Sequence, residues 1–102
     1  MDAKDLQKYR EEINKIDDEM LKLYIRRMEI CSHIGEYKKE NALSTYDPDR
    51  ETEILADVME KVGNPKFADG AMQLFITLMQ SSCELQDRII ADNWEDDFYE
   101  DI

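Results

Sequence analysis

Two cationic side chains stand out because they interrupt an apolar helical repeat. Arg27 occupies the position that Ile13, Met20 and Ile34 fill with apolar side chains in the same three-four repeat. A charge buried there without a partner is costly, so Arg27 needs a buried ion pair, a register-setting role or an anionic ligand. Lys38 follows eleven residues later, a rotation of about 20° and a rise of roughly 16 Å on an ideal helix. The two cations can therefore converge on one small molecule.

Arg10 lies on the flank of the same repeat. It is about 25 Å along an ideal helix from Arg27, beyond the reach of a shared metabolite-sized ligand. If Arg10 contributes to the same site, it must come from a second, antiparallel copy of the chain.

Polar residues further along the chain complete a candidate binding set. Ser82 and Gln86 are one helical turn apart and either contact a ligand or join two helices. Arg50 and Glu51 are either surface charges or site residues. Together with Arg27 and Lys38, these residues suggest a water-poor pocket between helices. It would offer cations to two carboxylates and a glutamate to a hydroxyl, with a lysine and an amide not assigned to any of these groups. The lone His33 has no nucleophile at a recognisable spacing, and no metal-ligand cluster is visible.

Three helices are predicted to position these residues. The apolar repeat runs through residues 5–40 without a proline, which predicts one helix near 50 Å long. Asp47 before Pro48 caps a second helix that ends at Gly63-Asn64-Pro65, and a third opens near Pro65. Gly35 inside the first helix indicates close packing. Sixty further residues cannot cover so long a helix, so it needs a partner, most simply a second copy of itself.

Composition supports a single all-α domain and excludes several functions. The 102 residues are 42% hydrophobic with 3 Gly and 2 Pro, unlike a disordered or turn-rich all-β chain. The net charge of −12 disfavours nucleic acid and anionic membranes as partners. The acidic start and the lack of a long apolar run predict a cytoplasmic protein. Cys31 and Cys83 are expected to be buried free thiols. We predict a helical domain over residues 1–91 and an acidic, aromatic-containing tail over 92–102.

Four segments of the sequence resemble the all-α class of chorismate mutase over roughly residues 5–90. Their order and spacing carry the resemblance more than any one segment does. They are Leu6 to Asp17, Arg26-Arg27-Met28-Glu29-Ile30 with Gly35-Glu36-Tyr37-Lys38, Asp47-Pro48-Asp49-Arg50-Glu51, and Ser82-Cys83-Glu84-Leu85-Gln86.

The resemblance implies an intertwined homodimer of three-helix protomers with antiparallel first helices. It implies a Claisen rearrangement of chorismate to prephenate, in the branch toward phenylalanine and tyrosine, with no cofactor and no metal. Lys38 and Gln86 would meet the ether oxygen, and Glu51 with the backbone at Asp47 would hold the ring hydroxyl. The carboxylates would be bound by Arg27 and by Arg10 of the other protomer, with Ser82 and Arg50 beside them. The residues implied as catalytic are Lys38, Gln86 and Arg27.

Two alternatives remain open at this point. An isochorismate pyruvate lyase resembles the same fold and uses a similar cationic pocket to eliminate pyruvate. A non-catalytic regulatory or assembly module for a shikimate-pathway enzyme is favoured by the acidic aromatic tail. The intact set of buried cations counts against that module, since a structural dimer has no need for them.

Overall fold

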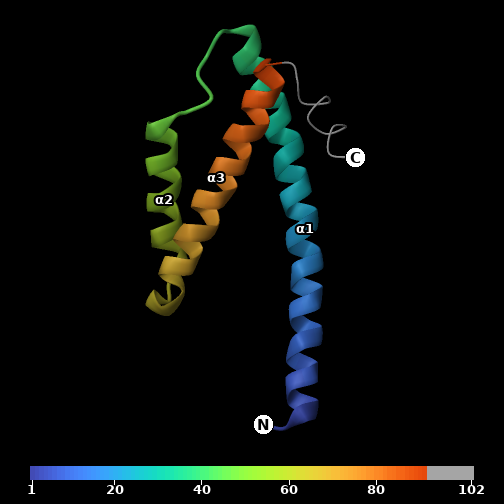
Figure 1. Ribbon diagram of the computed structural model, residues 1–102. Coiled ribbons are helices and arrows are strands. Elements are labelled where there is room, and N and C mark those ends of the chain that lie inside the picture. The colour runs from blue at the N-terminus through green and yellow to red at the C-terminus, as the bar shows by residue number, and fades with distance from the viewer. Residues whose placement is uncertain (92–102) are drawn as a thin grey trace. The chain divides into compact units, whose positions relative to one another are not determined.

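The structure, a computed structural model, describes residues 1–91, and the predicted tail at 92–102 lies outside the described residues. Figure 1 shows the elements in chain order: α1 (Ala3–Glu40), α2 (Pro48–Val62), a short 3-10 turn η1 (Pro65–Phe67) and α3 (Ala68–Ala91). Within residues 1–91 there is no strand. The predicted all-α fold with a long first helix is therefore confirmed.

The long helix α1 has a defined cap at each end. The Asp2 carboxylate accepts hydrogen bonds from the backbone N–H groups of Lys4 and Asp5, at 2.9 and 3.1 Å, which satisfies donors that the first turn leaves without partners. At the other end, the N–H of Leu43 donates to the carbonyl of Lys38 at 2.8 Å. Ala42 adopts φ 53°, so the helix ends in a Schellman motif with alanine where glycine is usual. This motif fixes the backbone at Lys38.

The segment from α2 to α3 follows the predicted capping residues closely. Asp47 accepts from the backbone N–H of Arg50 at 3.1 Å, and Gly63 ends α2 at φ 73°, a conformation that favours glycine. The sequence predicts that the third helix opens near Pro65. Instead Pro65–Phe67 forms η1 under an Asn64 cap, and α3 begins at Ala68.

The chain divides into two compact units, and the boundary falls inside α1. The first unit, Met1–Ile30, is a single stretch of helix. Its predicted apolar stripe lies open to solvent, with Ile13, Ile16 and Leu23 exposed by 54%, 55% and 64%. The same stripe includes Leu6, Tyr9 and Met20, all exposed. A contiguous exposed apolar face of this kind is typical of an interaction surface.

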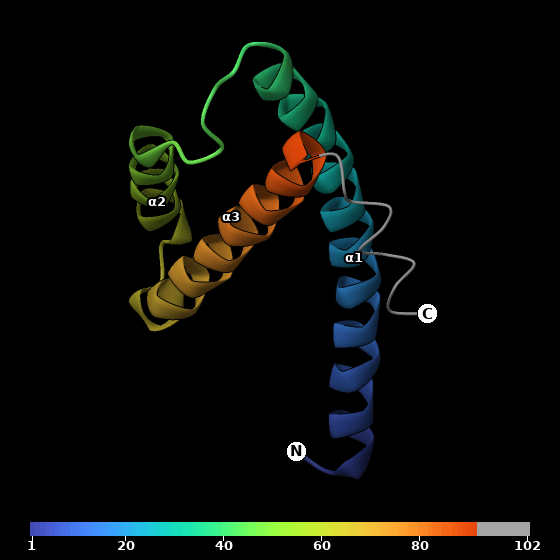
Figure 2. The same cartoon turned by 45° about the horizontal axis from the view of Figure 1, so that its top comes forward.

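The second unit begins at Cys31 and holds the buried residues of the described chain. Here α2 packs along α3, as both views show (Figures 1 and 2). The end of α1 meets α3 at Gly35, where an added Cβ would lie 3.1 Å from Gln86 Cγ and 3.3 Å from its Cα. This confirms Gly35 as a close-packing site. The contact brings the backbone of α1 against the turn of α3 that carries Gln86.

Candidate active site

Lys38 and Gln86, predicted to act together, meet in the second unit. Lys38 Nζ on α1 donates to Gln86 Oε1 on α3 at 3.0 Å and to the Thr45 carbonyl at 3.2 Å. The Gln86 side chain is only 5% exposed, and Lys38 is half-buried. An ammonium group has three N–H donors, so within residues 1–91 these two acceptors leave one donor for a ligand. The Gly35 contact allows this meeting, because a larger residue there would push Gln86 away.

Ser82 lies one turn before Gln86 and is also buried, at 7% exposure. Its hydroxyl donates to the Leu78 carbonyl at 2.8 Å and accepts from Cys31 Sγ at 3.4 Å. Ser82 therefore joins α3 to the part of α1 that carries Gly35. The sequence predicts Ser82 as either a ligand contact or an interhelical contact; the second is observed, and a contact with a ligand stays a prediction.

The start of α2 presents Glu51 and Arg50 differently. Glu51 is half-buried, and its backbone N–H donates to the Asp47 carbonyl at 3.1 Å. The Arg50 side chain is 61% exposed and pairs with Glu53 at 3.4 Å, so within one chain Arg50 is a surface charge. The Asp47 side chain caps the helix. The contact of its backbone with a ligand hydroxyl stays a prediction.

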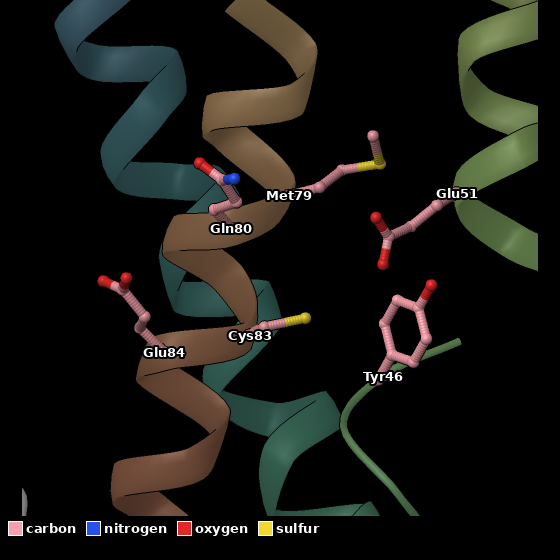
Figure 3. Close-up of a pocket in the computed structure, with 6 residues that line it drawn as sticks. All are labelled: Tyr46, Glu51, Met79, Gln80, Cys83 and Glu84. Carbon is pink, nitrogen blue, oxygen red and sulfur yellow. The ribbon is translucent and has the colours of Figure 1, made fainter. Parts of the chain in front are cut away.

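A pocket of about 510 Å³ opens beside Glu51. In Figure 3, Met79 and Cys83 project from α3 toward Glu51 of α2 and Tyr46 of the preceding segment. Gln80 and Glu84 complete the lining. Cys83 Sγ donates to the Thr45 carbonyl at 3.4 Å, the same oxygen that accepts from Lys38. One carbonyl therefore links the pocket wall to the Lys38 ammonium.

The two thiols differ in their surroundings. Both are free; Cys31 is buried, as predicted, but Cys83 is only half-buried because it lines the pocket. Burial raises the pKa of the Cys83 thiol above its ordinary value, and the Glu51 carboxylate raises it further. The Lys38 ammonium acts on the Cys83 pKa in the opposite direction. Opposite charges from α2 and α1 therefore act on the same wall of the pocket.

Arg10 and Arg27 belong to the first unit, Met1–Ile30. Arg10 is exposed, whereas Arg27 is half-buried. Both lie on α1, as predicted. Their action on the same ligand as Lys38 stays a prediction.

Sequence reasoning missed Thr45, Asp87, Tyr46 and Cys83 as neighbours of the site. Thr45 Oγ1 donates to Asp87 Oδ1 at 2.6 Å, and nothing in helical periodicity indicates a contact between a connecting segment and a helix. Cys83 could have been found, because it is three residues before Gln86 on α3 and therefore close to the same face. His33 is exposed on α1.

The site is organised for electrostatic contact and positioning. In residues 1–91 no group of three or more histidine, cysteine or acidic side chains is placed to hold a metal ion. No helix in that same range has both the length and the apolar character to cross a bilayer. In the second unit, the Lys38 ammonium is oriented by the Gln86 amide and the Thr45 carbonyl. The Glu51 carboxylate lines the neighbouring pocket.

The described chain is an all-helical domain in which an oriented lysine ammonium lies near a pocket. Residues 9–87 match the family described as chorismate mutase type II. The match covers most of the sequence, so the chain belongs to the chorismate mutase type II family.

Two curated relatives share part of this sequence. A protein named T-protein from Haemophilus influenzae is 36% identical over 50 residues, covering 49% of this chain and 13% of that protein. A bifunctional chorismate mutase/prephenate dehydratase from Aquifex aeolicus is 36% identical over 55 residues, covering 54% of this chain and 15% of that protein. The matched segment is thus a small part of each relative. No solved structure matches the chain significantly.

Proposed function

We propose that this chain is a chorismate mutase that rearranges chorismate to prephenate. The observation that carries the proposal is the pairing of Lys38 Nζ with Gln86 Oε1 at 3.0 Å in a member of the chorismate mutase type II family. These are the two residues to which the sequence resemblance assigns the ether oxygen. The name of the Aquifex relative includes the same activity.

The chemistry requires one carbon–oxygen bond to break while one carbon–carbon bond forms, with no group lost or gained. The carbon–oxygen bond stretches first, so negative charge grows on the ether oxygen. The Lys38 ammonium stabilises that charge more in the transition state than in the substrate, which raises kcat. The amide of Gln86 orients the ammonium and offers an N–H donor of its own to the same oxygen.

Positioning supplies a second part of the rate. Even a 10⁶-fold acceleration needs about 8 kcal/mol, more than one contact provides. The arginines would bind the two carboxylates and hold the flexible substrate compact, so that its reacting ends meet. Glu51, half-buried at the pocket, would accept a hydrogen bond from the ring hydroxyl.

The active form is proposed to be an antiparallel homodimer with shared sites, in which Arg10 comes from the other protomer. The exposed apolar stripe of Met1–Ile30 supports this arrangement. Covering such a side chain contributes about 1.5–3 kcal/mol when it passes from exposed to fully buried. A second copy of the same helix carries the matching stripe.

The test is a continuous assay of chorismate consumption with separation of the products, and isochorismate in a parallel reaction. Prephenate formation supports the mutase. Pyruvate release from isochorismate as the dominant reaction would instead favour the lyase. Inactivity of a folded dimer on both substrates would contradict catalysis by this chain and favour a non-catalytic module that docks on a shikimate-pathway enzyme.

A further inference from the structure

Thr45 makes three hydrogen bonds to residues of α1 and α3, although it lies outside every helix. Its carbonyl accepts from Lys38 Nζ at 3.2 Å and from Cys83 Sγ at 3.4 Å. Its hydroxyl donates to Asp87 Oδ1 at 2.6 Å. Thr45 is half-buried and Asp87 is exposed. A residue of the segment between α1 and α2 is therefore tied to both α1 and α3.

The hydroxyl contact ties Thr45 to α3 at a second point, beside its carbonyl. Short O–H···O⁻ hydrogen bonds are among the stronger ones in proteins. The Thr45 carbonyl has no helical hydrogen bond to fix it, because residues 41–47 lie between helices. The hydrogen bond from the Thr45 side chain to Asp87 restricts the backbone that carries this carbonyl. Asp87 follows Gln86 directly, so the same turn of α3 anchors both acceptors of the Lys38 ammonium.

We infer that Thr45 and Asp87 are positioning residues for Lys38, an inference that rests on the proposed mutase function. Asp87 holds the Thr45 hydroxyl, and the Thr45 carbonyl takes one N–H of Lys38 while Gln86 takes a second. The third N–H is then directed at the ligand. A lysine side chain has four rotatable bonds and orients poorly by itself, so two fixed acceptors on different segments restrict the ammonium to one direction.

This arrangement predicts an effect on turnover more than on substrate binding. In the proposed function the carboxylates of the substrate are bound by arginines, whereas Thr45 contacts Lys38 and Asp87 contacts Thr45. Loss of the tie lets the ammonium move away from the developing charge, and a misplacement of about 1 Å costs as much as a hundredfold in rate. The signature is a lower kcat with little change in KM.

The kinetic test compares Thr45→Val and Asp87→Ala with Thr45→Ser, which keeps the hydroxyl. Thr77→Val, at an exposed threonine of α3, is the matched control for the loss of a hydroxyl. We expect Thr45→Val and Asp87→Ala each to lower kcat by roughly tenfold to a hundredfold with KM within about twofold. The kcat of the double variant should be no lower than that of the less active single variant, because both substitutions remove the same hydrogen bond. Thr45→Ser and Thr77→Val should match the wild type.

A second measurement does not depend on activity. In protein labelled with ¹⁵N-lysine, a hydrogen-bonded ammonium exchanges its protons slowly and gives a resolved NMR signal, which Lys38→Arg identifies by its loss. We expect Thr45→Val and Asp87→Ala to abolish the Lys38 signal and Thr77→Val to keep it. If the wild type is inactive, the mutase proposal fails, and this signal alone decides: its persistence in both variants overturns the tie. If the wild type is active, unchanged kcat in both variants overturns the positioning role.

Discussion

At the scale of residues, the site depends on how charges of opposite sign are distributed around a few polar atoms. The Lys38 ammonium is held by two neutral acceptors, Gln86 Oε1 and the Thr45 carbonyl. Neither acceptor neutralises the charge, so it remains available to an anionic transition state. A carboxylate in place of Gln86 would compete with the ligand for the same cation.

The Cys83 thiol reports on this charge distribution. Its pKa is raised first by burial and then by the Glu51 carboxylate, and is lowered by Lys38. A raised pKa means less thiolate at a given pH, so alkylation by iodoacetamide should accelerate at a higher pH than for an ordinary thiol. Glu51→Gln should move that midpoint down, and Lys38→Met should move it up.

The measurement follows Cys83 by peptide mass spectrometry, which separates it from the buried Cys31. Glu53→Gln, at an exposed position of α2, is the control and should leave the midpoint in place. Equal midpoints in Glu51→Gln and the wild type would show that Glu51 does not face the thiol.

At the scale of elements, helix packing sets the position of Gln86. Gly35 allows α1 to approach α3, with Gln86 Cγ 3.1 Å from the place of an added Cβ. Gly70 in α3 has nothing within 4 Å of that place. The two glycines therefore separate the effect of helix propensity from the effect of packing.

Gly70→Ala should stabilise the protein by about 0.5–1 kcal/mol, because alanine loses less conformational entropy in a helix. Gly35→Ala should lose that gain, since overpacking typically costs about 1–3 kcal/mol, and should lower kcat by displacing Gln86. Urea unfolding and steady-state kinetics of both variants measure the two effects. A Gly35→Ala protein as stable and as active as Gly70→Ala would contradict close packing at this site.

Most of the helical architecture could be predicted from local chemistry. The Asp47–Pro48 start and the Gly63 end of α2 follow from capping preferences. The meeting of Lys38 with Gln86 was implied only by resemblance, because they are 48 residues apart. Thr45 could not be found by periodicity, since its contacts come from a segment between helices.

At the scale of the whole molecule, one chain leaves an apolar face uncovered. The stripe of Met1–Ile30 is exposed from Leu6 to Leu23, and a second copy is the partner we propose. The active sites are shared if Arg10 of one protomer and Lys38 of the other bind the same substrate molecule.

Mixed dimers test this sharing. An Arg10→Ala chain and a Lys38→Ala chain, each inactive alone, should regain up to one intact site per heterodimer when refolded together. Differently tagged chains allow the heterodimer to be purified, and Lys8→Ala replaces Arg10→Ala in the control mixture, because Lys8 is a neighbouring exposed cation. That control should keep activity in its homodimer as well. Confirmed Arg10→Ala/Lys38→Ala heterodimers without activity would contradict shared sites.

The central claim is that the oriented Lys38 ammonium drives conversion of chorismate to prephenate. The most direct measurement is product-resolved turnover of chorismate by the wild type and by Lys38→Ala, with circular dichroism as the check on folding. The account predicts prephenate from the wild type and a kcat lower by several orders of magnitude in the folded variant. Turnover near the wild-type level in Lys38→Ala would remove Lys38 from the mechanism and contradict the account.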